Sequence, residues 1–178
     1  MIESYYWKED LIAHAKKLKP VKNPPRFSER LVVNFEKELI ISFFLIRKLI
    51  ETHKVSQKSI QYRAEIFCYK PTGKKITRLN FTAFDEIYDL KNEQKVQKSI
   101  IFITNQFIHS CTIFAFRNLK NRNWDGVYAC SDYERDKTIY HIPINEIIKI
   151  FQLVGKDYPS SYNLIWDNDM DDFRVEIS

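Results

Sequence analysis

The chain has 178 residues, of which 44% are hydrophobic and 29% are charged, and its formal net charge is +5. This balance is typical of a packed globular domain and excludes a mainly disordered chain. From the whole pattern we predict one domain over residues 1–178, of the α+β class. Two N-terminal helices, the second long and very apolar, should pack on a mostly antiparallel β-sheet, and a short helix should precede a C-terminal β-hairpin.

Residues 3–19 predict the first helix, because apolar residues recur near helical spacing between Tyr6 and Leu18 and Pro20 then stops the pattern. The first residues lack the lysine-led apolar core of a signal peptide. We therefore expect a cytoplasmic protein.

The next segment, residues 20–27, contains three prolines and predicts an extended connector, with Ser28 as the N-cap of a second helix. Between residues 16 and 30 the cations are opposed only by Glu29. Cations held along an extended segment suit the phosphate backbone of a nucleic acid. The predicted nucleic-acid-binding residues of this segment are Lys16, Lys17, Lys19, Lys22, Arg26 and Arg30.

The second helix is predicted over residues 29–53, and its middle is apolar nearly all round. Its most apolar run, Leu39 to Ile46, is far shorter than the ~20 residues that span a bilayer, so we expect no membrane association. Such a helix needs cover on more than one side, from the sheet and the first helix or from a second copy of the chain. We therefore predict a homo-oligomer formed through this helix.

Beyond Ser56 the pattern changes to aromatic and β-branched residues, and two strands at 62–70 and 76–83 are predicted to form a hairpin around a turn at 71–74. A second basic group, Lys74, Lys75 and Arg78, falls in this hairpin and extends the predicted nucleic-acid surface. Residues 84–90 predict one helical turn, and residues 91–98 a polar connector.

Residues 99–109 are compatible with a strand or a helix, and we favour a helix, in which Asn105 and His109 share one face. Polar groups inside so apolar a stretch must find partners. One interpretation is a structural hydrogen-bond network. The other is a site in which His109 acts as a base or ligand and Asn105 orients it.

Two short stretches, Asn-Gln-Phe-Ile-His-Ser at 105–110 and Ile-Arg-Lys-Leu-Ile-Glu at 46–51, resemble uncharacterised bacterial proteins for which no function is known. In addition, Arg47 and His53 stand six residues apart, which is similar to the Arg-x(4–6)-His signature of small helical ribonucleases of the HEPN type. That resemblance implies a catalytic role for Arg47 and His53. The HEPN family is all-helical, however, whereas much of this chain is predicted to form strands and loops.

The remaining elements are strands at 111–117, 126–131 and 138–144, a helix capped by Asn145 and ended by Gly155, and a hairpin at 162–166 and 173–177. The turn with Asp167, Asp169 and Asp171 lacks the central glycine of a calcium loop. The cysteines and histidines are not spaced as zinc ligands, and the three glycines are too dispersed for a phosphate-binding loop. We therefore predict no metal and no cofactor.

Two functions remain open. The first is a non-catalytic binding protein that engages nucleic acid or a protein partner through basic segments interleaved with aromatic residues, including Arg117, Lys120, Arg122 and Trp124. The alternative is a small metal-independent ribonuclease that uses His, Arg and Tyr side chains. We prefer the first.

Overall fold

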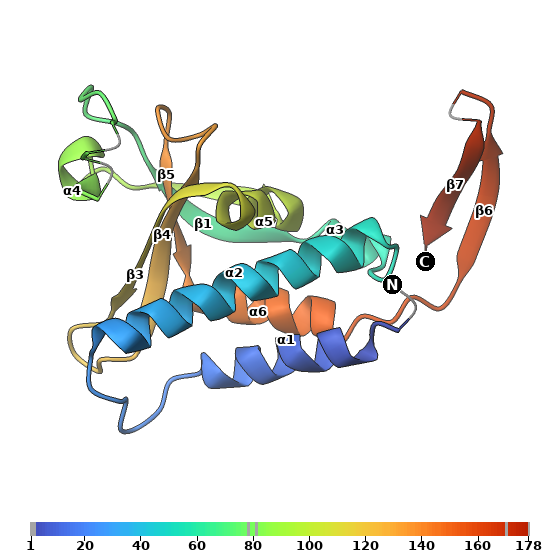
Figure 1. Ribbon diagram of the computed structural model, residues 1–178, viewed down its shortest axis with the longest axis horizontal. Coiled ribbons are helices and arrows are strands. Elements are labelled where there is room, and N and C mark those ends of the chain that lie inside the picture. The colour runs from blue at the N-terminus through green and yellow to red at the C-terminus, as the bar shows by residue number, and fades with distance from the viewer. Residues whose placement is uncertain (1–2, 78, 81, 170, 178) are drawn as a thin grey trace.

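The computed structural model describes residues 3–77, 79–80, 82–169 and 171–177, and it confirms an α+β fold with a mostly antiparallel sheet. Figure 1 shows three layers: the sheet, then α2, α5 and α6 across one of its faces, then α1 outside them. No helix in the described part of the chain is long and apolar enough to cross a membrane. The helices are α1 (Tyr5–Lys17), α2 (Glu29–Glu51), α3 (Gln57–Ile60), α4 (Phe84–Ile87), α5 (Ile100–Ile108) and α6 (Ile144–Gly155).

The predicted helix starts and stops are largely confirmed. Ser28 caps α2, its hydroxyl oxygen accepting the Leu31 N–H at 3.3 Å, and Ser99 caps α5 by accepting the Phe102 N–H at 3.2 Å. Residues 100–108 form a helix because Ser99 caps its first turn and because the apolar face of α5 packs on α2. The predicted N-cap at Asn145 is wrong, because α6 already begins at Ile144, after Pro143.

The five-stranded sheet has the order β2-β1-β5-β4-β3, and every neighbouring pair is antiparallel. A separate two-stranded sheet pairs β6 with β7, which confirms the C-terminal hairpin. The strands are β1 (Arg63–Tyr69), β2 (Gln94–Ser99), β3 (Ser110–Arg117), β4 (Trp124–Ser131), β5 (Ile139–Pro143), β6 (Tyr162–Asp167) and β7 (Asp172–Ile177).

The prediction of a hairpin between residues 62–70 and 76–83 is wrong. The partners of β1 are β5 and β2, and β2 is formed by residues that were expected to be a polar connector. The Asn80 side chain instead accepts the Thr77 N–H at 2.7 Å and donates to the Lys75 carbonyl at 3.0 Å, which are local contacts in place of strand pairing. β2 can be polar because it is an edge strand and largely solvent-exposed.

The main core lies between the sheet and the helices, where Phe43 stacks on Phe107 with ring centroids 4.1 Å apart. α1 lies close against α6 at Gly155, where an added Cβ would stand 2.9 Å from Ile12. A smaller apolar cluster forms on the opposite face of the sheet, under α4. The sheet therefore has one face fully covered by helices and one covered in part.

Candidate functional site

The candidate site is a basic end of the molecule, formed where the connector between α1 and α2 lies against the turn between β3 and β4. The side chain of Asn123 holds the connector there: its oxygen accepts the Val21 N–H at 2.9 Å and its nitrogen donates to the Val21 carbonyl at 3.1 Å. The Arg117 Nη1 donates to the Pro25 carbonyl at 2.8 Å. These contacts bring together two basic segments that are about a hundred residues apart in the sequence.

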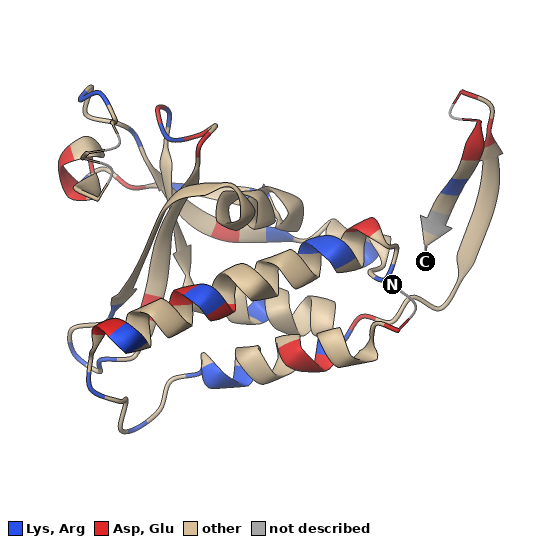
Figure 2. Cartoon of the chain, viewed as in Figure 1, with Lys and Arg blue, Asp and Glu red and all other residues tan. Residues whose placement is uncertain are grey.

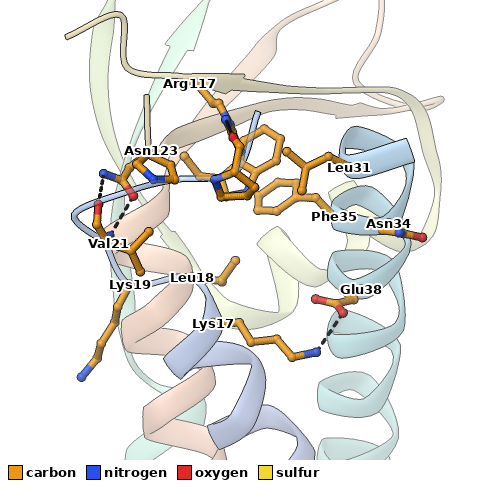
Figure 3. Close-up of a pocket in the computed structure, with 13 residues that line it drawn as sticks. Lys17, Leu18, Lys19, Val21, Leu31, Asn34, Phe35, Glu38, Arg117 and Asn123 are labelled. Atoms are coloured by element: carbon orange, nitrogen blue, oxygen red, sulfur yellow. Dashed lines mark hydrogen bonds and ion pairs between the residues drawn. The ribbon is translucent and has the colours of Figure 1, made fainter. Parts of the chain in front are cut away.

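A cavity of about 220 Å³ opens between the connector, the start of α2 and the β3–β4 turn (Figure 3). Arg117 and Asn123 lie on one rim, and the ion pair between Lys17 and Glu38, 2.9 Å long, lies on the other. The floor is apolar, and in it Phe35 stacks on Trp124 at 3.9 Å between centroids. A second cavity of about 350 Å³ shares Pro25 and Arg117 with the first and is also lined by Arg26, Phe27 and Arg122.

The electrostatics of this end favour an anion. Burial, with a further contribution from the nearby charge of Arg122, lowers the pKa of Arg117, and no carboxylate contributes to this shift. The Arg117 Nε is buried and has no hydrogen-bond partner among the described residues. The binding of a phosphate oxygen would therefore depend on the rest of the Arg117 guanidinium together with that of Arg122, which lines the same cavity.

A ring for stacking is available beside these cations. Phe27 is 59% exposed, and the Arg117 guanidinium lies 5.7 Å from its ring centroid and 4.8 Å from that of Trp124. A nucleobase can stack on an exposed ring of this kind while the neighbouring cations meet its phosphates. The site therefore combines the two kinds of contact that single-stranded nucleic acids use.

The structure brings only part of the predicted basic set to this site. In Figure 2 the charged residues of the connector are blue, and the first turn of α2 carries one acidic and one basic residue. The exposed cations of this region are Lys16 near the end of α1, Lys19, Lys22 and Arg26 in the connector, and Arg30 in α2. The segment between β1 and α4, which carries Lys74 and Lys75, lies at the opposite end of the sheet in Figure 1, and Lys74 pairs with Glu86 at 3.0 Å. Arg78 lies outside the described residues. The expected second contact is therefore not continuous with the connector.

Of the four predicted catalytic candidates, the structure joins two, Arg47 and Asn105, by a side-chain hydrogen bond. The Arg47 Nη1 donates to the Asn105 side-chain oxygen at 2.9 Å, and its Nε donates to Glu51 at 2.6 Å. His53 follows the end of α2 with a φ of 59° and is exposed, and His109 is the exposed C-cap of α5. The structure thus joins Arg47 to Asn105, and neither cavity at the basic end is lined by a histidine.

Two polar side chains of α5, Asn105 and Gln106, find partners in other elements, whereas the buried Thr104 hydroxyl has none among the described residues. The buried Gln106 side-chain oxygen accepts the Ser131 N–H at 2.9 Å, which ties α5 to the end of β4. With the contact between Asn105 and Arg47, this supports the structural interpretation of the stretch.

Two cysteines that are far apart in the sequence meet across β3 and β4. The Sγ atoms of Cys111 and Cys130 are 3.4 Å apart, and Cys130 is fully buried. The hydrogen bond between the thiols lowers the pKa of Cys111 to about 7 and raises that of Cys130, whose burial adds to the rise. Burial also raises the pKa of Cys68. Cys111 is therefore the thiol that ionises near neutral pH.

We expect iodoacetamide at pH 7 to alkylate Cys111 at least about tenfold faster than Cys68 or Cys130, because the thiolate is the nucleophile and the other two thiols are buried. Mass spectrometry of peptides after timed quenching measures the three rates. Cys111→Ser should remove the fast phase. Faster labelling of Cys130 than of Cys111 would contradict the assignment.

Among the described residues, no three His, Cys, Asp or Glu side chains are grouped as metal ligands would be. In the acidic turn of the C-terminal hairpin, the Asp167 carboxylate accepts the backbone N–H of Asp169 at 3.0 Å, as in an ordinary polar turn.

Sequence reasoning missed the role of Asn123 and of Phe27. An asparagine in a turn is common, and nothing local marks Asn123 as the residue that holds the connector. Phe27 stands beside Arg26 within the basic segment, and this adjacency is the one signal that could have pointed to it.

No family model, no curated protein and no solved structure matches the chain.

Proposed function

We propose that the protein is a non-catalytic nucleic-acid-binding protein and that single-stranded DNA or RNA binds at its basic end. The observation that carries the proposal is the joining of the connector to the β3–β4 turn, which places Arg117 and Arg122 beside the cations of residues 16–30. In this arrangement the phosphates contact the cations and one base stacks on Phe27. Such binding would have little sequence specificity.

Binding through the basic end should weaken steeply with salt, because each phosphate contact releases counterions. We expect a triple variant, Lys19→Gln with Lys22→Gln and Arg122→Gln, to reduce the slope of log affinity against log salt by about three, one for each lost contact. Fluorescence titration of labelled single strands of DNA and RNA between low and near-physiological salt measures this slope. All three side chains are exposed, so the fold should persist.

The matched control replaces Lys70, Lys74 and Lys75 with Gln at the opposite end of the sheet. An equal loss in both triple variants would place the binding elsewhere, and no binding of any strand at low salt would refute the proposal. A duplex of the same length, bound as tightly as the single strands, would argue against stacking on a ring.

Stacking is tested separately with Phe27→Ala, which should weaken binding by about 1–3 kcal/mol if one base stacks on this ring. Tyr133→Ala is the matched control, because Tyr133 is also an exposed ring under a cation, with Lys137 Nζ at 3.4 Å from its centroid, in the β4–β5 loop.

The same samples address the ribonuclease alternative. The Arg47 guanidinium already contacts Glu51 and Asn105, which supports a structural role for it. We expect labelled RNA to be recovered at full length after the titration. Cleavage that is lost in His109→Ala or His53→Ala would replace the binding proposal with the enzymatic one.

A further inference from the structure

Two of the three cysteines face each other at the end of the β3–β4 hairpin that is remote from its turn. Ser110 of β3 pairs with Ser131 of β4, and the next pair along the ladder is Thr112 with Cys130. The register therefore shifts by one residue, and Cys111 is the extra residue of a β-bulge. In an unbroken ladder Cys111 would point to the opposite face of the sheet from Thr112. The bulge thus turns the Cys111 thiol toward Cys130.

The two thiols are close enough to react with each other. Their Sγ atoms are 3.4 Å apart. A disulfide bond is about 2.05 Å long, so the sulfur atoms need to approach by only roughly 1.4 Å. Opposing residues of antiparallel strands have Cα atoms about 4.5–5.5 Å apart, which lies within the about 4.4–6.8 Å that a disulfide spans. A bond between β3 and β4 at this point therefore fits the spacing of the strands.

The two thiols differ in their access to solvent. Cys130 is fully buried in the apolar cluster under α4, where its Sγ lies 3.7 Å from the hydroxyl of Tyr88, which is itself buried. That hydroxyl donates to the Arg135 carbonyl at 2.6 Å, which holds the tyrosine in place. Cys111 is half-buried at the edge of the same cluster. A small reagent from solvent therefore meets Cys111 before Cys130.

The charges around the pair give the two thiols different roles. The hydrogen bond from Cys130 lowers the pKa of Cys111 to about 7, with support from the Arg135 guanidinium and against the effects of burial and of Asp132. The same hydrogen bond, burial and the charge on Cys111 raise the pKa of Cys130. Near neutral pH Cys111 is therefore the nucleophile, because the thiolate is the reactive form. Once Cys111 has reacted and lost its charge, the repulsion that keeps the proton on Cys130 is removed.

The third cysteine does not belong to this arrangement. Cys68 lies in the main core, between the sheet and the helices, and burial raises the pKa of its thiol. In the sheet, β5 separates β1, which carries Cys68, from β4. Cys68 is therefore an internal reference for a thiol that is buried and has no thiol beside it.

We propose that Cys111 and Cys130 are an oxidation-sensitive site and form a reversible disulfide when the protein meets a hydroperoxide. The Cys111 thiolate attacks one oxygen of hydrogen peroxide, the O–O bond breaks, the sulfur becomes a sulfenic acid, and the other oxygen leaves as hydroxide and is protonated to water. The Cys130 sulfur gives up its proton and attacks the Cys111 sulfur, so that the S–S bond forms and the S–O bond breaks. The departing hydroxide takes up that proton as the second water. Two thiols are thus oxidised and one peroxide is reduced.

A peptide map of the full chain after oxidation tests the bond. Reduced protein is treated with hydrogen peroxide, and the remaining thiols are alkylated in denaturant. Trypsin then places Cys111 on peptide 99–117 and Cys130 on peptide 123–135. We expect these two peptides to be recovered as one linked species, lighter by two hydrogen atoms than their sum, and to form at least about tenfold faster than any oxidation of Cys68. Dithiothreitol should restore both thiols.

Three variants separate the steps. Cys130→Ala should react more slowly, because Cys111 loses a hydrogen bond, and should stop at the sulfenic acid, which dimedone traps as a stable adduct. Cys111→Ser should leave Cys130 unoxidised, because no neighbouring sulfur remains to carry the reaction inward. Cys68→Ala is the matched control and should form the linked species as the wild type does. Circular dichroism checks the fold of each variant, and the wild-type map does not depend on them.

Four results of the peptide map would overturn the proposal. They are Cys111 recovered as a sulfinic acid beside a free Cys130 thiol, a disulfide that includes Cys68, a disulfide between two chains, and thiols that stay reduced in excess peroxide. The site lies at the other end of the β3–β4 hairpin from the proposed nucleic-acid site, so either proposal can fail without the other.

Discussion

Phe43→Ala is expected to lower the free energy of unfolding by about 3–5 kcal/mol, the range for a large buried aromatic side chain. Phe43 is fully buried in the main core, where it stacks on Phe107 and meets the edge of Phe151 at 5.3 Å between centroids. Removing its ring leaves a cavity where α2, α5 and α6 converge. Urea unfolding followed by circular dichroism measures the loss as a lower midpoint with an unchanged slope.

The matched control is the next residue. Phe44 points outward and is 46% exposed, so Phe44→Ala should change the unfolding free energy by less than about 1 kcal/mol. Equal losses at the two positions would show that α2 is rotated relative to the arrangement described here.

Glu146→Ala is expected to cost about 2–4 kcal/mol, because it removes a buried carboxylate that accepts hydrogen bonds from two partly buried donors. The Glu146 carboxylate, in the first turn of α6, accepts the Tyr62 hydroxyl at 2.8 Å and the Glu65 N–H at 3.2 Å. It also pairs with Lys149. These contacts join α6 to β1 and to the segment that precedes it. Glu146→Gln keeps an acceptor and should lose less than half as much.

The pH dependence of this loss has a definite sign. Burial by itself raises the pKa of Glu146, but the hydrogen bonds from Lys149, Tyr62 and the Glu65 N–H outweigh it, so the folded-state pKa is lowered. The ionised carboxylate therefore stabilises the fold above the ordinary pKa of about 4.3, and this contribution is lost as the pH falls through the lower folded-state value. The difference between the wild type and Glu146→Gln should shrink in that acidic range. A difference that grows on acidification would contradict the assignment.

The elements that could be predicted from the sequence are those in which local chemistry and burial agree. Pro20 ends α1 and Ser28 caps α2, and both signals act within one turn of the helix. The C-terminal hairpin was predictable because its apolar residues alternate on both sides of a polar turn. Such patterns are local, so no knowledge of distant contacts is needed to interpret them.

Strand pairing was not predictable in the same way. β1 and residues 76–83 have a suitable composition and a Pro-Thr-Gly turn between them, yet β1 pairs with β5 and with the polar edge strand β2. The choice among partners depends on which strands the helices can cover, and an edge strand needs little apolar sequence of its own. Composition alone therefore cannot select the partner.

By itself the sequence determined the fold class, the end of α1 and the start of α2, and the presence of a crowded basic connector. It could not determine what that connector touches. The tertiary structure decided that Asn123 and Arg117 hold it against a turn about a hundred residues away, and that Lys74 and Lys75 lie at the other end of the sheet. It likewise paired Cys111 with Cys130 and Arg47 with Asn105. The physical reason is that charge and helical periodicity are properties of neighbouring residues, whereas a binding site is formed by the packing of distant segments around a common core.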